Sequence, residues 1–125
     1  MTGQLSDAEA LRAALRRDLT AAMKAREPEA VAVLRTAIAA IDNAEAIAAP
    51  GTAPGATSPY IAGARAGLGA AEAARRQLTR DELQTILRDQ VTEYTREADR
   101  YAGHGQDTAA QRLRNQASLL ARYLS

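Results

Sequence analysis

The chain has 125 residues, enough for one domain with a single core. It contains no Cys, Trp or Phe, which excludes a disulfide framework, a thiolate metal site and a cysteine nucleophile, and the many Ala residues favour helices over sheets. The 16 basic and 15 acidic side chains give a formal net charge of +1, so the molecule as a whole lacks the strongly basic character of many nucleic-acid-binding proteins.

The N-terminal sequence has no apolar core typical of a signal peptide. No stretch of the chain has the apolar length that a membrane span needs. We therefore expect a cytoplasmic protein.

The first predicted helix covers about residues 8–25, with Asp7 as its cap. Its expected buried side carries apolar residues four apart: Leu11, Leu15, Leu19 and Met23. Basic residues lie largely off this stripe: Arg12, Arg16, Arg17 and Lys24. The pattern is that of an amphipathic helix with a basic flank.

The second predicted helix, 28–48, has apolar residues on two adjoining faces, so we expect it to be central in the fold. Pro28 suits a first helical position, and Pro50 with Gly51 ends the run. The connection from the first helix is only two or three residues long. The first two helices should therefore form an antiparallel hairpin.

Residues 49–59 are rich in Pro, Gly and small polar residues and predict a flexible loop, which we extend to about residue 69. A short helix over 70–77 is compatible with the sequence that follows.

A third helix is predicted over about 80–102, because Thr79 and Glu82 form a capping box and the Gly103-His104-Gly105 turn can end it. A fourth helix, 107–124, begins at Asp107. The sequence thus predicts an all-α fold of two antiparallel helical hairpins, which form one four-helix domain over 1–125 and are joined by a Pro/Gly-rich loop.

Charge is divided unevenly between the last two predicted helices. Residues 80–100 hold four Arg against six acids, whereas 108–125 hold three Arg and no acid. We expect the two helices to attract each other through exposed ion pairs, in preference to offering a charged face to a partner.

No motif of an enzyme is present. Glu93 and Glu97 each have an Arg three residues later, which is typical of a solvated helix face. His104 is the only histidine and stands in a predicted turn, and the glycines at 63–69 do not form a phosphate loop. We expect no catalytic residues, no metal and no cofactor.

Tyr94 and Tyr101 are seven residues apart on the apolar stripe of the third predicted helix. Two tyrosines at this spacing could stack nucleic-acid bases. Packing in the core, with the hydroxyl groups at its rim, is the favoured interpretation.

Two blocks of sequence together resemble the GatB/YqeY family. The first, residues 11–45, contains Asp-Leu at 18–19, Ala-Met-Lys-Ala-Arg at 22–26, Leu-Arg at 34–35 and an ending at Glu45. The second, 78–124, contains a Leu-Thr-x-x-Glu start, a charged helix, a Gly-containing turn and a final Tyr-Leu. Family chains usually continue beyond this Tyr-Leu into a small second helical subdomain, which we expect to be missing here, and the Pro-rich residues 49–59 lengthen the middle.

The resemblance implies an all-helical module similar to the tail region of the B subunit of the tRNA-dependent amidotransferase. It implies tRNA, or a protein of the aminoacylation machinery, as partner. It carries over no catalytic residues, so the chain would be at most accessory to a carbon–nitrogen ligase with glutamine as amido donor.

If RNA is bound, phosphate contacts should come from the basic flank of the first helix and the central helix. The candidate nucleic-acid-binding residues are Arg12, Arg16, Arg17, Lys24, Arg26 and Arg35. Lys24, Arg26 and Arg35 also match the family motif. For Arg35, an ion pair with Asp42 or with an acid of the third helix is the alternative.

A protein-interaction or self-association domain without RNA binding is the second hypothesis. In this case Ile47 and the rest of the wide apolar arc of the second helix would pack against another chain.

Overall fold

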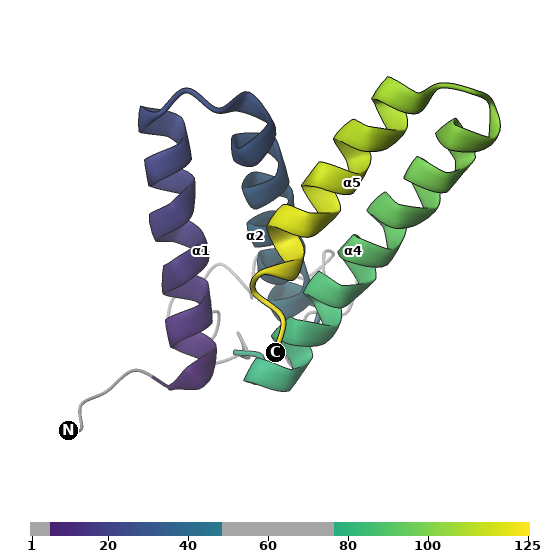
Figure 1. Ribbon diagram of the computed structural model, residues 1–125. Helices are drawn as coiled ribbons and strands as arrows, with labels where there is room; N and C mark the ends of the chain where they lie inside the picture. The colour runs from purple at the N-terminus through teal and green to yellow at the C-terminus, as the bar shows by residue number, and fades with distance from the viewer. Residues whose placement is uncertain (1–5, 49–76) are drawn as a thin grey trace, which may run out of the picture.

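A computed structural model describes residues 6–48 and 77–125 of the chain. The described part is all-α, with helices α1 (Asp7–Lys24), α2 (Pro28–Ala48), α4 (Arg80–Gly103) and α5 (Asp107–Ala121). Helices α1 and α2 form one antiparallel hairpin, and α4 and α5 form another (Figure 1). This confirms the predicted fold class. The predicted loop over 49–69 and short helix over 70–77 lie outside the described residues, apart from Gln77, which is not helical.

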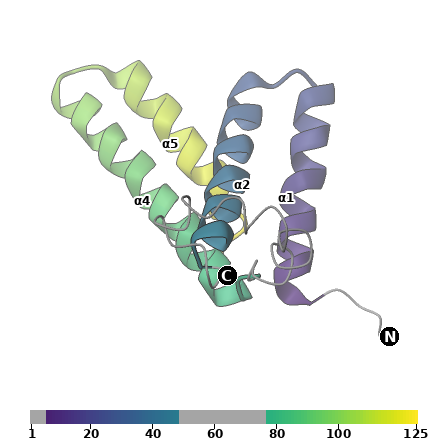
Figure 2. The same cartoon turned by 180° about the vertical axis from the view of Figure 1, so that it is seen from behind.

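The two hairpins form a V. They meet near the N-terminal end of α1, and both interhelical turns lie at the other end, where the hairpins diverge (Figures 1 and 2). Helix α2 contacts all three other helices, as its two apolar faces predict. Its side chains Val33, Leu34, Ala37 and Ile41 are buried.

The core forms where the hairpins meet. It combines residues of α1, α2, α4 and α5, among which the fully buried large side chains are Leu15, Leu34, Ile41, Leu83, Leu87, Leu120 and Val33. Ile47, near the end of α2, is 71% exposed.

The buried side of α1 differs from the predicted one. Leu11 and Leu15 are buried, but the last buried position is Ala22, and Met23 is 49% exposed. Residues four apart advance by 400° around a helix, so a stripe with strict four-residue spacing rotates by 40° at each step. The prediction that Met23 would point inward is therefore wrong.

One of the three predicted N-terminal helix caps is confirmed. Thr79 and Glu82 form the predicted capping box, with the Glu82 amide donating to Thr79 Oγ1 over 3.2 Å. For α1 the cap is Ser6 and not Asp7, because Ser6 and Glu9 satisfy each other's amides. For α5 the cap position is Gln106, which makes no side-chain capping bond, and Asp107 is the first helical residue.

Helix α5 ends three residues earlier than predicted. The side chain of Gln84, which is buried on α4, donates to the Tyr123 carbonyl over 2.8 Å and accepts from the Ser125 amide over 3.0 Å. These two bonds hold the last residues of the chain against α4 outside the helix. The Gln84 side chain thus forms hydrogen bonds with backbone groups that would be paired within α5 if that helix were longer.

Candidate nucleic-acid interface

The six predicted phosphate-binding residues lie in three different environments. Arg12 is partly buried, Arg16 and Arg17 are exposed beside acids, and Lys24, Arg26 and Arg35 are exposed around the turn between α1 and α2.

Arg12 is part of the structural core. Its guanidinium forms an ion pair with Glu45 of α2, and the two side chains are only 11% and 7% exposed. Arg12 Nη2 also donates to the Leu78 carbonyl over 3.3 Å, and the Leu78 amide donates to Glu45 over 3.3 Å. The three residues link α1, α2 and the segment before α4. Arg12 is therefore not placed to contact a phosphate.

Arg16 and Arg17 remain on the surface with acidic neighbours. Arg16 lies 3.7 Å from Asp42 of α2, and Arg17 lies 3.6 Å from Asp18. Since Asp42 is paired with Arg16, it is not the partner that the alternative interpretation gave to Arg35. Exposed pairs at these distances contribute little, so both arginines can exchange an acid for a phosphate.

Lys24, Arg26 and Arg35 are gathered at one hairpin end. Lys24 closes α1, Arg26 is in the turn, and Arg35 lies two turns into α2. Arg26 and Arg35 line one shallow hollow of about 530 Å³, together with Pro28 and Val31. Among residues 6–48 and 77–125, no ion pair is found for these three cations. They form what we call the turn cluster.

The backbone at Arg26 is in the left-handed region, with φ +57°. The Glu27 amide donates to the Ala22 carbonyl and the Arg26 amide to the Met23 carbonyl, which is the Schellman pattern at a helix end. The turn after α4 has the same pattern, but there the left-handed residue is Gly105, with φ +75°. Gly adopts this conformation without strain, whereas Arg does not.

Tyr123, which follows α5 in the chain, contacts α1. Its hydroxyl donates to Asp18. Burial and this hydrogen bond to a carboxylate raise the pKa of Tyr123 well above its usual value of 10.0. The tyrosine therefore stays neutral and keeps its donor proton at neutral pH.

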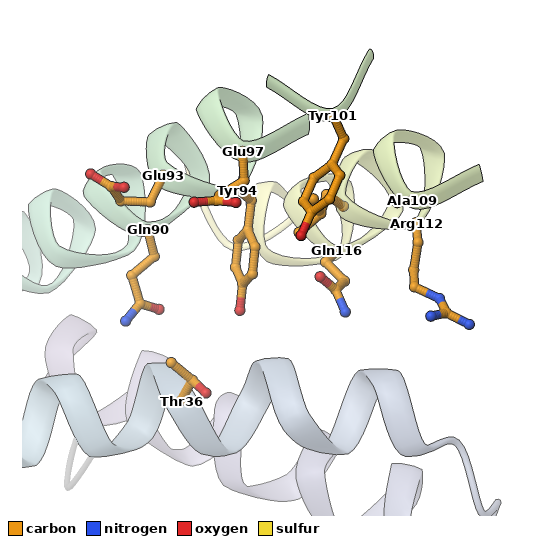
Figure 3. A pocket seen from close by; sticks show the side chains of 10 residues that line it. Thr36, Gln90, Glu93, Tyr94, Glu97, Tyr101, Ala109, Arg112 and Gln116 are labelled. Carbon is orange, nitrogen blue, oxygen red and sulfur yellow. The ribbon is translucent and has the colours of Figure 1, made fainter. Parts of the chain in front are cut away.

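Sequence analysis did not anticipate a cleft between α2 and the outer part of the α4–α5 hairpin. The cleft has a volume of about 590 Å³ and is lined from α4 by Gln90, Glu93, Tyr94, Glu97 and Tyr101, from α5 by Ala109, Arg112, Leu113 and Gln116, and from α2 by Thr36 (Figure 3). We call it the hairpin cleft.

The side chains of Gln90, Tyr94 and Gln116 extend across the hairpin cleft toward α2, where Thr36 faces them (Figure 3). Tyr94 also packs against the core, as predicted, and its burial raises the pKa of its hydroxyl. Tyr101 is 37% exposed, so the expectation that it packs in the core is wrong. The seven-residue spacing correctly placed both rings on one face of α4, but it could not show that α2 diverges from this face toward the interhelical turn.

The expected attraction between α4 and α5 is present as an exposed contact. Arg114 of α5 lies 3.3 Å from Asp99 of α4. On α4 itself, Arg96 and Arg100 pair with Glu93 and Glu97, in the predicted three-residue spacing.

Among the described residues, no group of three or more acids or histidines is arranged to hold a metal ion. His104 is exposed at the C-terminal cap of α4. None of the described helices combines the length and apolar character that a membrane span requires.

No protein-family model, curated protein or solved structure matches the chain.

Proposed function

We propose that this chain is a non-catalytic helical module of the GatB/YqeY type that binds tRNA through the phosphate backbone. Its place would be beside the tRNA-dependent aminoacylation or amidotransferase machinery. The turn cluster of Lys24, Arg26 and Arg35 is the centre of the proposed contact, and Arg16 and Arg17 extend it along α1.

The conformation of Arg26 is the observation that carries this proposal. A large side chain is held at a left-handed position where the corresponding turn of the same molecule uses Gly105. Such an outlier supports a role for the side chain, because glycine would satisfy the backbone at lower cost. Lys24 and Arg35 are exposed cations of the same cluster, so the role that we propose for Arg26 is the binding of phosphates.

The test is fluorescence anisotropy with labelled bulk tRNA at 50 and 200 mM salt. If Lys24, Arg26 and Arg35 each neutralise one phosphate, affinity should fall by about 40-fold between these concentrations. The double variant Lys24→Glu, Arg26→Glu should remove binding at 200 mM salt.

The matched control is Arg88→Glu, Arg114→Glu, which changes net charge by the same amount on the other hairpin. It should bind more tightly than the double variant of the turn cluster. Equal losses in both proteins, or no binding by the wild type at 50 mM salt, would refute the proposed RNA contact.

Self-association is a second candidate function, and the exposure of Ile47 favours it. A large apolar side chain in water is unfavourable, and contact with another chain would remove its surface from solvent. Sedimentation velocity should then show a mass that rises with protein concentration, and Ile47→Glu should abolish the rise. A concentration-independent monomer would exclude this candidate.

A further inference from the structure

The hairpin cleft has a charge opposite to that of the turn cluster. Two carboxylates, Glu93 and Glu97, lie along its α4 wall, and Arg112 is the cation among its lining residues. Arg112 is itself bound by Glu29 of α2 over 2.6 Å. The hairpin cleft is therefore unfavourable for a phosphate and favourable for a cation.

Within residues 6–48 and 77–125, the ion-pair partners of the two carboxylates are exposed arginines of α4. Glu97 accepts a hydrogen bond from Arg100 over 2.8 Å, and Glu93 lies 3.6 Å from Arg96. Pairs exposed to this degree are weak and salt-screened, so an incoming cation can take the place of either arginine.

Two aromatic rings stand beside the carboxylates. Tyr94 and Tyr101 lie on the same face of α4 as Glu97, and both line the hairpin cleft (Figure 3). The face of a tyrosine ring attracts an ammonium or guanidinium group, and an adjacent carboxylate strengthens the attraction.

Gln90 supplies an unused hydrogen-bond acceptor. Its Oε1 atom is buried and has no hydrogen-bond partner in the described parts of the chain. A buried acceptor of this kind is costly unless a donor reaches it.

The hairpin cleft is large enough for an occupant that inserts more than one side chain. A volume of about 590 Å³ is in the range that accommodates a segment of several side chains. Leu113 and Ala109 of α5 add apolar surface to the lining, so an occupant should carry apolar residues next to its cation.

We propose that the hairpin cleft binds a basic amphipathic segment of a partner protein, with one arginine or lysine side chain over Tyr94 and Tyr101 and next to Glu97. This site goes beyond the proposed RNA contact, because it uses the other hairpin and the opposite charge. A module with both surfaces would join an RNA to a protein.

The experiment uses a labelled synthetic helical peptide with Leu along one face and Arg along the other. It is titrated into the full chain, and binding is followed by anisotropy and by the ring-proton NMR signals of the protein. The chain has four Tyr and no Phe or Trp, so these signals are few, and Tyr→Leu variants assign them. Saturable binding should shift the signals of Tyr94 and Tyr101 and leave that of Tyr123 in place.

Tyr101→Ala should weaken peptide binding by about 3- to 10-fold, which is the effect of losing one cation–π contact at a partly exposed site. Glu97→Gln, which keeps the shape of the side chain, should weaken it by a similar factor. Asp99→Asn is the matched control, because Asp99 is an exposed acid of the same helix outside the cleft lining. It should bind the peptide like the wild type.

Four outcomes would overturn the proposal. These are the absence of saturable binding, equal binding of a peptide with Glu in place of Arg, unchanged affinity in both cleft variants, and displacement of the peptide by an equal concentration of spermidine. The Lys24→Glu, Arg26→Glu variant should bind the peptide normally, so failure of the tRNA proposal is distinguishable from failure of this one.

Discussion

The two ends of the α4–α5 hairpin have the same kind of sequence but different surroundings. Near the C-terminus, Leu87 of α4 and Leu120 of α5 are fully buried against the first hairpin. Near the interhelical turn, Tyr101 and Leu113 continue the same helical faces but line the open hairpin cleft. We call these the base and the tip of the hairpin.

The difference shows that an apolar stripe does not by itself define a core. The stripe on α4 runs along the whole helix, but the first hairpin covers only the base, because the two hairpins diverge (Figure 1). The residues of the tip also change character, from leucines to tyrosines, glutamines and acids. This composition suits a surface that is apolar on one side and wet on the other.

The largest effect is expected at the ion pair of Arg12 and Glu45, which joins α1 to α2 and also contacts Leu78, just before the base of the second hairpin. Arg12→Ala would leave the carboxylate of Glu45 buried without its counter-ion, so we expect unfolding free energy to fall by about 3 to 5 kcal/mol. Urea denaturation followed by circular dichroism measures this.

The double variant Arg12→Met, Glu45→Met serves as the control, because it removes both charges and fills similar volume. It should recover much of the loss. A single variant Arg12→Ala with wild-type stability would show that the pair does not stabilise the contact between α1, α2 and the segment before α4.

A matched pair of leucine substitutions compares base and tip directly. Leu87→Ala creates a cavity in the packed base and should cost about 2 to 5 kcal/mol. Leu113→Ala removes the same atoms from the wall of an open cleft, where water can enter, so it should cost about 1 kcal/mol. Equal losses in thermal or urea denaturation would mean that the tip is packed as tightly as the base.

Tyr123→Phe tests the edge of the base, where the last residues of the chain contact α1. Loss of the hydrogen bond to Asp18 should lower stability by about 1 to 2 kcal/mol at neutral pH. Asp18→Asn is the companion variant, because an amide oxygen can still accept the hydrogen bond without a charge.

The hydrogen bond between Tyr123 and Asp18 should also make the stability of the protein depend on pH in the alkaline range. The pKa of Tyr123 is raised in the folded protein, so the unfolded chain loses this proton first, near pH 10. The stabilisation is complete below about pH 10 and is lost as pH rises further. Stability measured from pH 8 to 11 should fall less steeply in Tyr123→Phe than in the wild type.

The smallest effect is expected at the turn between α1 and α2, at the open end of the V. Arg26→Gly should raise stability by about 0.5 to 1 kcal/mol, because glycine accepts the left-handed backbone without strain. The same variant should weaken tRNA binding. Gly105→Ala in the other turn is the reciprocal experiment and should destabilise, and a stabilising result there would contradict the account of both turns.

The helices, their pairing into hairpins and the central place of α2 could be predicted from the amino-acid sequence. These features follow from local rules: apolar periodicity, the capping box at Thr79, the proline at position 28 and connections too short for anything but antiparallel neighbours. It also located the basic residues, and three of them, Lys24, Arg26 and Arg35, are exposed around one turn.

Contacts between distant segments determine which polar residues are structural and which apolar residues are exposed. Arg12 was predicted to be a surface cation, but its guanidinium contacts Glu45 and Leu78. No sequence pattern indicated that Gln84 would donate a hydrogen bond to the Tyr123 carbonyl. Tyr101 was predicted to pack in the core but is exposed, because the two hairpins diverge at the tip. The contacts of Arg12 and Gln84 join residues 33 and 39 positions apart, and such pairings have no local signature in the sequence.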